Sequence, residues 1–227
     1  MSIIDNYNKI KEEIKNCAIS SGRDPEDIKI ISVSKTLPPI IIQEAIDSGI
    51  SLFGENKIQE AKSKIPELKG DFIFQFIGHL QSNKVRDAVM LFDTIHSLDK
   101  LSTCYKVDKE AEKINKIQKI LIQVNTSGEK TKNGIQPEEV LVLCEKILLL
   151  KNIDLLGFMT IGPLSDNSNS IRNSFKLLRK SLEEINTKLQ INIKELSMGM
   201  SSDYKIAVEE GATFVRIGSA IFGDRSY

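Results

Sequence analysis

Lys35 is the residue of this sequence best placed to do chemistry, because it ends an apolar, β-branched run. Residues 28–36 read Ile-Lys-Ile-Ile-Ser-Val-Ser-Lys-Thr, which is typical of a strand buried on both faces in a parallel sheet. A lysine at such a strand end loses hydration, which favours the neutral, nucleophilic amine that forms a Schiff base with an aldehyde. The alternative is that Lys35 only extends its ammonium group into solvent.

Two later stretches have the residues of a phosphate site. Residues 197–203, Ser-Met-Gly-Met-Ser-Ser-Asp, place glycine and hydroxyl groups directly before a predicted helix, where free backbone N–H groups favour an anion. Residues 216–220, Arg-Ile-Gly-Ser-Ala, repeat this pattern after a predicted strand. The alternative for Ser201 and Ser202 is ordinary N-capping, which is compatible with phosphate binding. A Schiff-base lysine and a phosphate site are together the minimal requirement for pyridoxal 5'-phosphate.

The elements that must position these residues alternate along the chain. Apolar periodicity predicts an amphipathic helix at 3–20, then strands at 28–36, 51–54, 72–77, 92–96, 119–124, 153–159, 194–197 and 213–217, separated by helices at 40–48, 55–68, 81–90, 100–114, 137–149, 169–188 and 203–210. Eight strands alternating with helices predict an α/β fold, a (β/α)8 TIM barrel with an extra N-terminal helix. A doubly wound sheet fits less well, because no Gly-rich turn opens the first helix.

The length of 227 residues is close to the roughly 250 of a typical (β/α)8 barrel, although it also allows two small domains. No repeat, low-complexity tract or linker interrupts the alternation of strands and helices. A single domain over residues 1–227 is therefore predicted.

Charge and cysteine content narrow the classes of function. The chain has 31 basic and 31 acidic residues, which argues against a general attraction to nucleic acid or to an anionic membrane. Cys17, Cys104 and Cys144 form no Cys-x-x-Cys pair, so neither a disulfide framework nor a metal site is predicted. No apolar run approaches the ~20 residues of a membrane span, and no signal peptide precedes the first helix. A cytoplasmic location is therefore expected.

Polar residues recur at the ends of the predicted strands, where the loops of a barrel build its active face. Asn56 follows the second predicted strand and His79 follows the third. Taken singly, Asn56 is explained as a helix cap and His79 as a loop residue. Their shared location with Lys35 indicates a common site.

Seven ordered motifs resemble the pyridoxal phosphate homeostasis protein family over essentially the whole chain. They are 33–36 (Val-Ser-Lys-Thr), 53–60 (Phe-Gly-Glu-Asn-Lys-Ile-Gln-Glu), 76–84 (Phe-Ile-Gly-His-Leu-Gln-Ser-Asn-Lys), 124–129 (Val-Asn-Thr-Ser-Gly-Glu), 157–160 (Gly-Phe-Met-Thr), 196–201 (Leu-Ser-Met-Gly-Met-Ser) and 216–223 (Arg-Ile-Gly-Ser-Ala-Ile-Phe-Gly). The departures are small: Phe158 stands where leucine is common, and Ser219 where threonine is common. The resemblance implies the fold-type III barrel of the alanine racemase N-terminal domain, with pyridoxal phosphate bound through a lysine after the first strand.

The resemblance assigns eight residues to the cofactor site, namely Lys35, Asn56, His79, Met198, Ser201, Arg216, Gly218 and Ser219. It makes Lys35 the Schiff-base lysine, and it makes Ser201, Gly218 and Ser219 the phosphate ligands. Arg216 is expected to face the pyridine nitrogen, with structural pairing to a carboxylate such as Glu195 as the alternative. Asn56 and His79 are expected to line the pocket near the ring. Met198 is assigned to the pocket wall, with core packing as its alternative.

The expected function is intracellular homeostasis of pyridoxal phosphate, in which the protein stores, protects and delivers the cofactor to apo-enzymes without turnover. No catalytic residue is predicted, and a monomer is expected in preference to a dimer. The alternative is a fold-type III amino-acid racemase, which needs acid/base groups on both faces of its substrate and takes a tyrosine from a second domain of the other subunit. The chain ends at Tyr227 without such a domain, which favours the carrier. A class I aldolase-like barrel would not need the phosphate loops together with Arg216.

Overall fold

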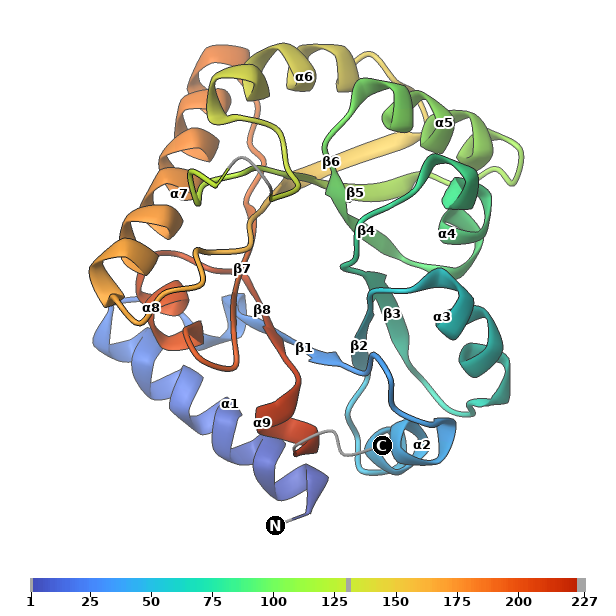
Figure 1. Ribbon diagram of the computed structural model, residues 1–227, viewed down its shortest axis with the longest axis vertical. Coiled ribbons are helices and arrows are strands. Elements are labelled where there is room, and N and C mark those ends of the chain that lie inside the picture. Colours follow the sequence, from blue (N-terminus) through green and yellow to red (C-terminus); the bar gives the residue numbers. More distant parts are fainter. Residues whose placement is uncertain (1, 130–131, 224–227) are drawn as a thin grey trace.

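The computed structural model describes residues 2–129 and 132–223, and its centre is a closed barrel of eight parallel strands (Figure 1). The strands follow one another in chain order, and β8 pairs with β1 to close the barrel. They are β1 Lys29–Val33, β2 Leu52–Glu55, β3 Ile73–Phe76, β4 Thr94–Leu98, β5 Gln118–Gln123, β6 Ile153–Met159, β7 Glu195–Met200 and β8 Phe214–Ile217. The predicted (β/α)8 barrel is confirmed.

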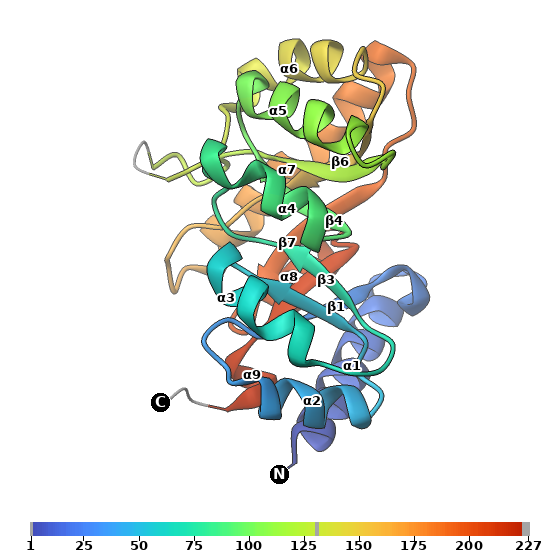
Figure 2. The same ribbon diagram turned by 90° about the vertical axis from the view of Figure 1, so that its right-hand side faces the viewer.

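Helices surround the barrel, as Figures 1 and 2 show. They are α1 Ile3–Ser20, α2 Pro39–Asp47, α3 Ile58–Lys64, α4 Val85–Leu91, α5 Leu101–Glu112, α6 Val140–Ile147, α7 Ser168–Leu189, α8 Tyr204–Glu209 and α9 Ser219–Phe222. The extra N-terminal helix α1 begins at a capping box between Ser2 and Asp5, which explains why its predicted start is confirmed. It packs against α8 and α9. The short helix α9 was not predicted from the sequence.

Several predicted helices are shorter in the structure, and residues 55–68 are the clearest case. The sequence predicted a helix over residues 55–68, whereas Glu55 continues β2 by pairing with Phe76 of β3, and α3 begins only at Ile58. A 3-10 turn at Ile65–Glu67 replaces the end of the predicted helix. Pro66 explains this end, because its ring nitrogen has no hydrogen to donate to the preceding turn.

The apolar core lies between the strands and the helices, where the fully buried side chains include Phe53, Phe158 and Phe175. Strands β6 and β7 approach so closely that a Cβ atom on Gly157 would lie 1.9 Å from the backbone oxygen of Glu195. Glycine is therefore required at this point of the barrel wall. Among the described helices, none is long and apolar enough to cross a membrane.

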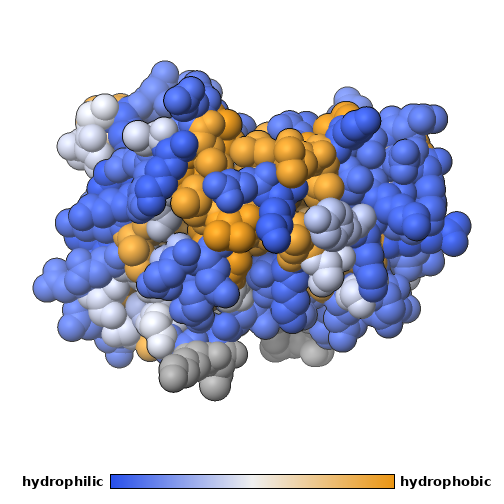
Figure 3. All heavy atoms as spheres, turned by 90° about the horizontal axis from the view of Figure 1, so that it is seen from above, coloured by the Kyte–Doolittle hydropathy of each residue, from blue (hydrophilic) through white to orange (hydrophobic). Residues whose placement is uncertain are grey.

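Some large apolar side chains remain exposed on the outer ring of helices. Leu149, just after α6, is 80% exposed, and Val142 and Leu148 are also exposed. Figure 3 looks onto the α6 side of the molecule and shows an apolar area between hydrophilic flanks. This area lies on the helical layer and not at the end of the barrel where the predicted site residues gather.

Candidate functional site

A cavity of about 660 Å³ lies at the carboxyl ends of the strands. Seven of the eight predicted site residues line it, namely Lys35, Asn56, His79, Ser201, Arg216, Gly218 and Ser219. They come from loops or strand ends after β1, β2, β3, β7 and β8. Closing the barrel therefore brings together residues that are up to 184 positions apart in the sequence, from Lys35 to Ser219.

The structure does not bring Met198 to this cavity. Its side chain is fully buried in the apolar core, whereas Met200 lines the cavity and is 38% exposed. The intervening Gly199 has φ +90°, and the pairing register of β7 with β8 shifts between Ser197 and Met200. This irregularity changes the alternation of side chains along β7, so the core packing that was the alternative for Met198 is the arrangement found.

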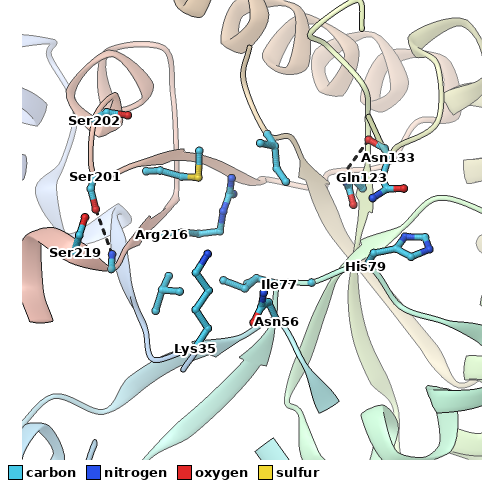
Figure 4. Close-up of a pocket in the computed structure, with 15 residues that line it drawn as sticks. Lys35, Asn56, Ile77, His79, Gln123, Asn133, Ser201, Ser202, Arg216 and Ser219 are labelled. Atoms are coloured by element: carbon cyan, nitrogen blue, oxygen red, sulfur yellow. Dashed lines mark hydrogen bonds between the residues drawn. The ribbon is translucent and has the colours of Figure 1, made fainter. Parts of the chain in front are cut away.

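Lys35 lies two residues after Val33, the last residue of β1, and its side chain extends into the cavity (Figure 4). The residue is half-buried. Within residues 2–129 and 132–223, its Nζ atom makes no hydrogen bond or ion pair, so its amine is available to a ligand.

The two predicted phosphate loops lie side by side. The backbone N–H of Gly218 donates a hydrogen bond to Ser201 Oγ at 3.3 Å, which joins the loop after β7 to the loop after β8. Figure 4 shows Ser201, Ser202 and Ser219 on the same side of the cavity. The Gly218 donor is thus directed to Ser201, while the hydroxyl of Ser219 has no hydrogen-bond partner among the described residues. The hydroxyl groups are therefore the more accessible ligands for an anion.

Arg216 lies inside the barrel and is only 5% exposed. Its Nη1 donates to Ser197 Oγ at 2.7 Å, and its Nη2 donates to the Thr160 carbonyl at 2.7 Å. Burial lowers the pKa of Arg216 to about 10, and nearby Asp203 opposes this shift. The guanidinium group therefore keeps its charge at neutral pH, and the donors not used in these two bonds can contact a ligand in the cavity.

The alternative partner suggested for Arg216 is engaged elsewhere. Glu195 accepts a hydrogen bond from Lys29 Nζ at 3.2 Å and another from the Thr213 hydroxyl at 2.5 Å. The structural pairing of Arg216 with Glu195 is therefore wrong.

A buried hydrogen-bonded chain behind Arg216 was missed by the sequence analysis. The Nδ1 atom of His96 lies 3.0 Å from Ser197 Oγ, and its Nε2 lies 2.8 Å from Gln75 Oε1. Because a carbonyl oxygen only accepts hydrogen bonds, Nε2 carries the proton, and Nδ1 accepts from the Ser197 hydroxyl. Burial, together with the charge of Arg216, lowers the pKa of His96 to about 3. His96 is therefore neutral and orients the serine that holds Arg216.

The opposite side of the cavity carries a second group of polar residues. Gln123 ends β5, is 4% exposed, and donates from Nε2 to the Asn133 carbonyl at 3.1 Å. Figure 4 shows Gln123, Asn133 and His79 across the cavity from the serines. Gln123 lies near the end of a predicted strand, so the strand-end criterion used for Asn56 could have found it.

Tyrosine was the residue that a racemase would need. Tyr204 is near the serine loop in sequence, but its hydroxyl donates to Glu13 Oε2 of α1 at 2.7 Å and it does not line the cavity. Tyr7 and Tyr105 do not line the cavity either. Tyr227 lies outside the described residues.

This arrangement fits a phosphorylated aldehyde. Lys35 offers a free amine, the hydroxyl groups of Ser201 and Ser219 offer donors to an anion, and Arg216 holds a fixed positive charge at the base of the same cavity. Few ligands need an amine, anion donors and a fixed cation together, because a phosphate alone requires no free amine and an aldehyde alone requires no anion site.

Comparison with known proteins identifies relatives of the whole chain. A family model described as alanine racemase, N-terminal domain, matches residues 26–226. The pyridoxal phosphate homeostasis protein of Aquifex aeolicus (strain VF5) is 40% identical over 228 residues, which cover 100% of this chain and 100% of that protein.

Solved structures agree with this relationship. The structure of PipY from Synechococcus elongatus PCC7942 with PLP bound has a TM-score of 0.82 and 34% identity, and the match covers 92% of this chain and 100% of PipY. Alanine racemase from Clostridium difficile 630 has a TM-score of 0.76 at 18% identity, covering 100% of this chain and 57% of the racemase. The likeness to the racemase is one of fold alone.

The neutral state of His96 predicts a dependence of stability on pH. The pKa of His96 is about 3 in the folded protein against an ordinary value of 6.5, so the unfolded chain binds a proton that the folded protein excludes. The stability that the folded protein has with a neutral His96 is fully present above about pH 6.5. It is lost as the pH falls, because protonation of the histidine then favours the unfolded chain. We expect wild-type protein to lose about 2 kcal/mol more than His96→Gln between about pH 7.5 and about pH 5. Urea unfolding at both pH values measures this difference, and equal losses would contradict it.

Proposed function

The chain belongs to the family of the pyridoxal phosphate homeostasis proteins, and we propose that it binds pyridoxal 5'-phosphate through Lys35 and keeps it available to apo-enzymes. The observation that carries this proposal is the unpartnered amine of Lys35 in a cavity that also holds Ser201, Ser219 and Arg216. The PLP bound to PipY supports it, because PipY is 34% identical and shares the fold.

Each residue has a separate part in holding the cofactor. Pyridoxal phosphate supplies an aldehyde carbon, to which a lysine amine can bond covalently and reversibly. Lys35 provides that amine. Ser201 and Ser219 donate hydrogen bonds to the phosphate, and Gly218 keeps their two loops together through its bond to Ser201. Asn56 lines the cavity beside Lys35, and His79 lines its opposite side with Gln123 (Figure 4).

The charge of Arg216 favours binding of the cofactor without catalysis. Ser197 and Thr160 fix its guanidinium group from behind, which leaves the cavity-facing donors for the pyridine nitrogen. A group that stays positively charged opposes a second positive charge on that nitrogen, and this weakens the ring as an acceptor of electrons. The site is therefore better suited to storage than to carbanion chemistry.

A carrier without turnover is also supported by the positions of the described tyrosines. Racemisation needs proton transfer on both faces of the substrate, and none of the tyrosines at positions 7, 105 and 204 lines the cavity. The hydroxyl of Tyr204 is directed to Glu13 instead. We propose a monomeric, single-domain protein of the cytoplasm, where the free thiols of Cys17, Cys104 and Cys144 suit a reducing compartment.

Lys35→Ala should abolish covalent attachment of the cofactor. We expect borohydride reduction to add the mass of the cofactor to wild-type protein and to the control Lys109→Ala, but not to Lys35→Ala. Because Lys35 Nζ has no partner among the described residues, the free energy of unfolding should change by no more than about 0.5 kcal/mol. A reducible adduct in Lys35→Ala would assign the attachment to another lysine.

Removing both hydroxyl groups should weaken the phosphorylated ligand selectively. Hydrogen bonds to a charged group contribute about 1.5 to 3 kcal/mol each, so Ser201→Ala combined with Ser219→Ala should raise the Kd for pyridoxal phosphate at least about tenfold. Titration with pyridoxal, which lacks the phosphate, serves as the control and should give an unchanged Kd. Equal weakening of both ligands would place the phosphate elsewhere.

The carrier proposal expects no turnover of amino acids. Loaded wild-type protein incubated with L-alanine in deuterium oxide should leave the α-hydrogen in place and produce no D-alanine, because no described tyrosine reaches the cavity. Proton NMR and chiral chromatography measure the two quantities, with an alanine racemase as the positive control. Deuterium incorporation by the wild type that disappears in Lys35→Ala would favour the racemase alternative.

A further inference from the structure

Lys35 lies in a strained turn. The N–H of Leu37 donates to the Ser34 carbonyl at 3.1 Å, which closes a four-residue turn over residues 34–37. Thr36 has φ +65°, a left-handed conformation that β-branched residues rarely adopt. Its hydroxyl donates to the Lys35 carbonyl at 2.6 Å. Such strain persists only where the surrounding structure holds the backbone in place.

Three charged residues lie directly behind this turn, and we call Glu55, Glu60 and Lys64 the charged cluster. Lys64 Nζ donates to Glu55 Oε1 at 3.1 Å and to Glu60 Oε2 at 3.4 Å. The same ammonium group donates to the Ser34 carbonyl at 3.2 Å. The cluster is therefore bonded to the backbone of the turn as well as to itself.

The two carboxylates of the charged cluster hold the turn on either side of Lys35. Glu55 Oε1 accepts a hydrogen bond from the Ser34 hydroxyl at 2.7 Å. Glu60 Oε2 accepts the backbone N–H of Thr36 at 3.0 Å. The residue before Lys35 and the residue after it are thus both anchored, while Lys35 itself is free to extend into the cavity.

Stability alone does not explain why charges are buried here. The side chain of Glu55 is fully buried and that of Lys64 is 9% exposed. Burial raises the pKa of Glu55, and Lys64 and Ser34 act against this rise. A buried ion pair generally contributes no more than apolar side chains of similar size, because both charges lose their hydration. The charged cluster is instead explained by its hydrogen bonds to the strained backbone of residues 34 and 36, which hold the turn in place.

We propose that Glu55, Glu60 and Lys64 are positioning residues that hold the strained turn and so direct the Lys35 amine into the cavity. None of the three lines the cavity, so they act through the backbone of residues 34 and 36 and not on the ligand. The identity of the ligand rests on the proposed function, whereas the hold on the turn does not.

Variants at Glu60 test the hydrogen bond to Thr36. Glu60→Ala removes the acceptor, Glu60→Gln keeps an acceptor oxygen without the charge, and Glu67→Ala is a matched control at an exposed glutamate without a side-chain hydrogen bond in the described part of the chain. In cofactor-free protein, NMR hydrogen exchange of the Thr36 amide should become at least about tenfold faster in Glu60→Ala. The other two variants should exchange at the wild-type rate.

The same variants test the presentation of Lys35. The rate constant for covalent attachment of pyridoxal phosphate, followed by borohydride trapping and mass spectrometry, should fall at least about tenfold in Glu60→Ala, because small displacements of a reacting group are costly. Glu60→Gln should restore the wild-type rate. Wild-type rates in all three variants would overturn the proposal.

A double variant separates positioning from stability. Glu55→Gln combined with Lys64→Met leaves no unpaired charge in the protein interior, so its thermal unfolding should stay near that of the wild type. Attachment to Lys35 should nevertheless slow at least about tenfold, and wild-type attachment by this stable variant would also overturn the proposal. If wild-type protein attached no cofactor, the proposed function would fail, and exchange of the Thr36 amide in Glu60→Ala would still decide whether the cluster holds the turn.

Discussion

A guanidinium group inside a closed barrel is the constraint on which the interior of this protein depends. Arg216 keeps its charge at 5% exposure, and a charged group is tolerated there only where polar partners replace water. Ser197 and the Thr160 carbonyl provide these partners, and His96 stays neutral so that no second cation faces the first. A barrel interior is usually filled by branched apolar side chains, so the polar chain from Arg216 to Gln75 is specific to the needs of this site.

The order of strands then decides which residues share the cavity. Because β8 lies between β7 and β1, the serine loops after β7 and β8 are neighbours of Lys35 after β1. The hydrogen bond from Gly218 to Ser201 joins the two loops. Arg216 of β8 lies inside the barrel beneath them, held by Ser197 of β7. Three adjacent strands, β7, β8 and β1, thus supply the hydroxyl donors to an anion, the fixed cation and the free amine. The position of each group depends on closure of the barrel.

Sequence reasoning could predict the barrel and seven residues of its cavity, because apolar periodicity locates strands and the ends of parallel strands meet on one face. It failed at Met198, because Gly199 with φ +90° and the register shift in β7 alter an alternation that local periodicity assumes. It also missed the contact of His96 with Gln75 and Ser197, which lie 21 and 101 positions away in the sequence. Partners at such distances have no local signal, and only the closed barrel brings them together.

The arrangement of charges around Lys35 suits reversible binding of an aldehyde better than turnover. Reversible storage needs one well-placed amine and an anchor for the rest of the ligand, whereas turnover needs proton transfer at defined atoms on both faces. Arg216 stays charged near neutral pH and so moves no proton, and the hydroxyl of Tyr204 is engaged by Glu13. The strained residue Thr36 and the buried charges of Glu55 and Lys64 all lie at one turn. A fold in which a strained turn positions a single amine is suited to binding an aldehyde and to releasing it to a competing amine.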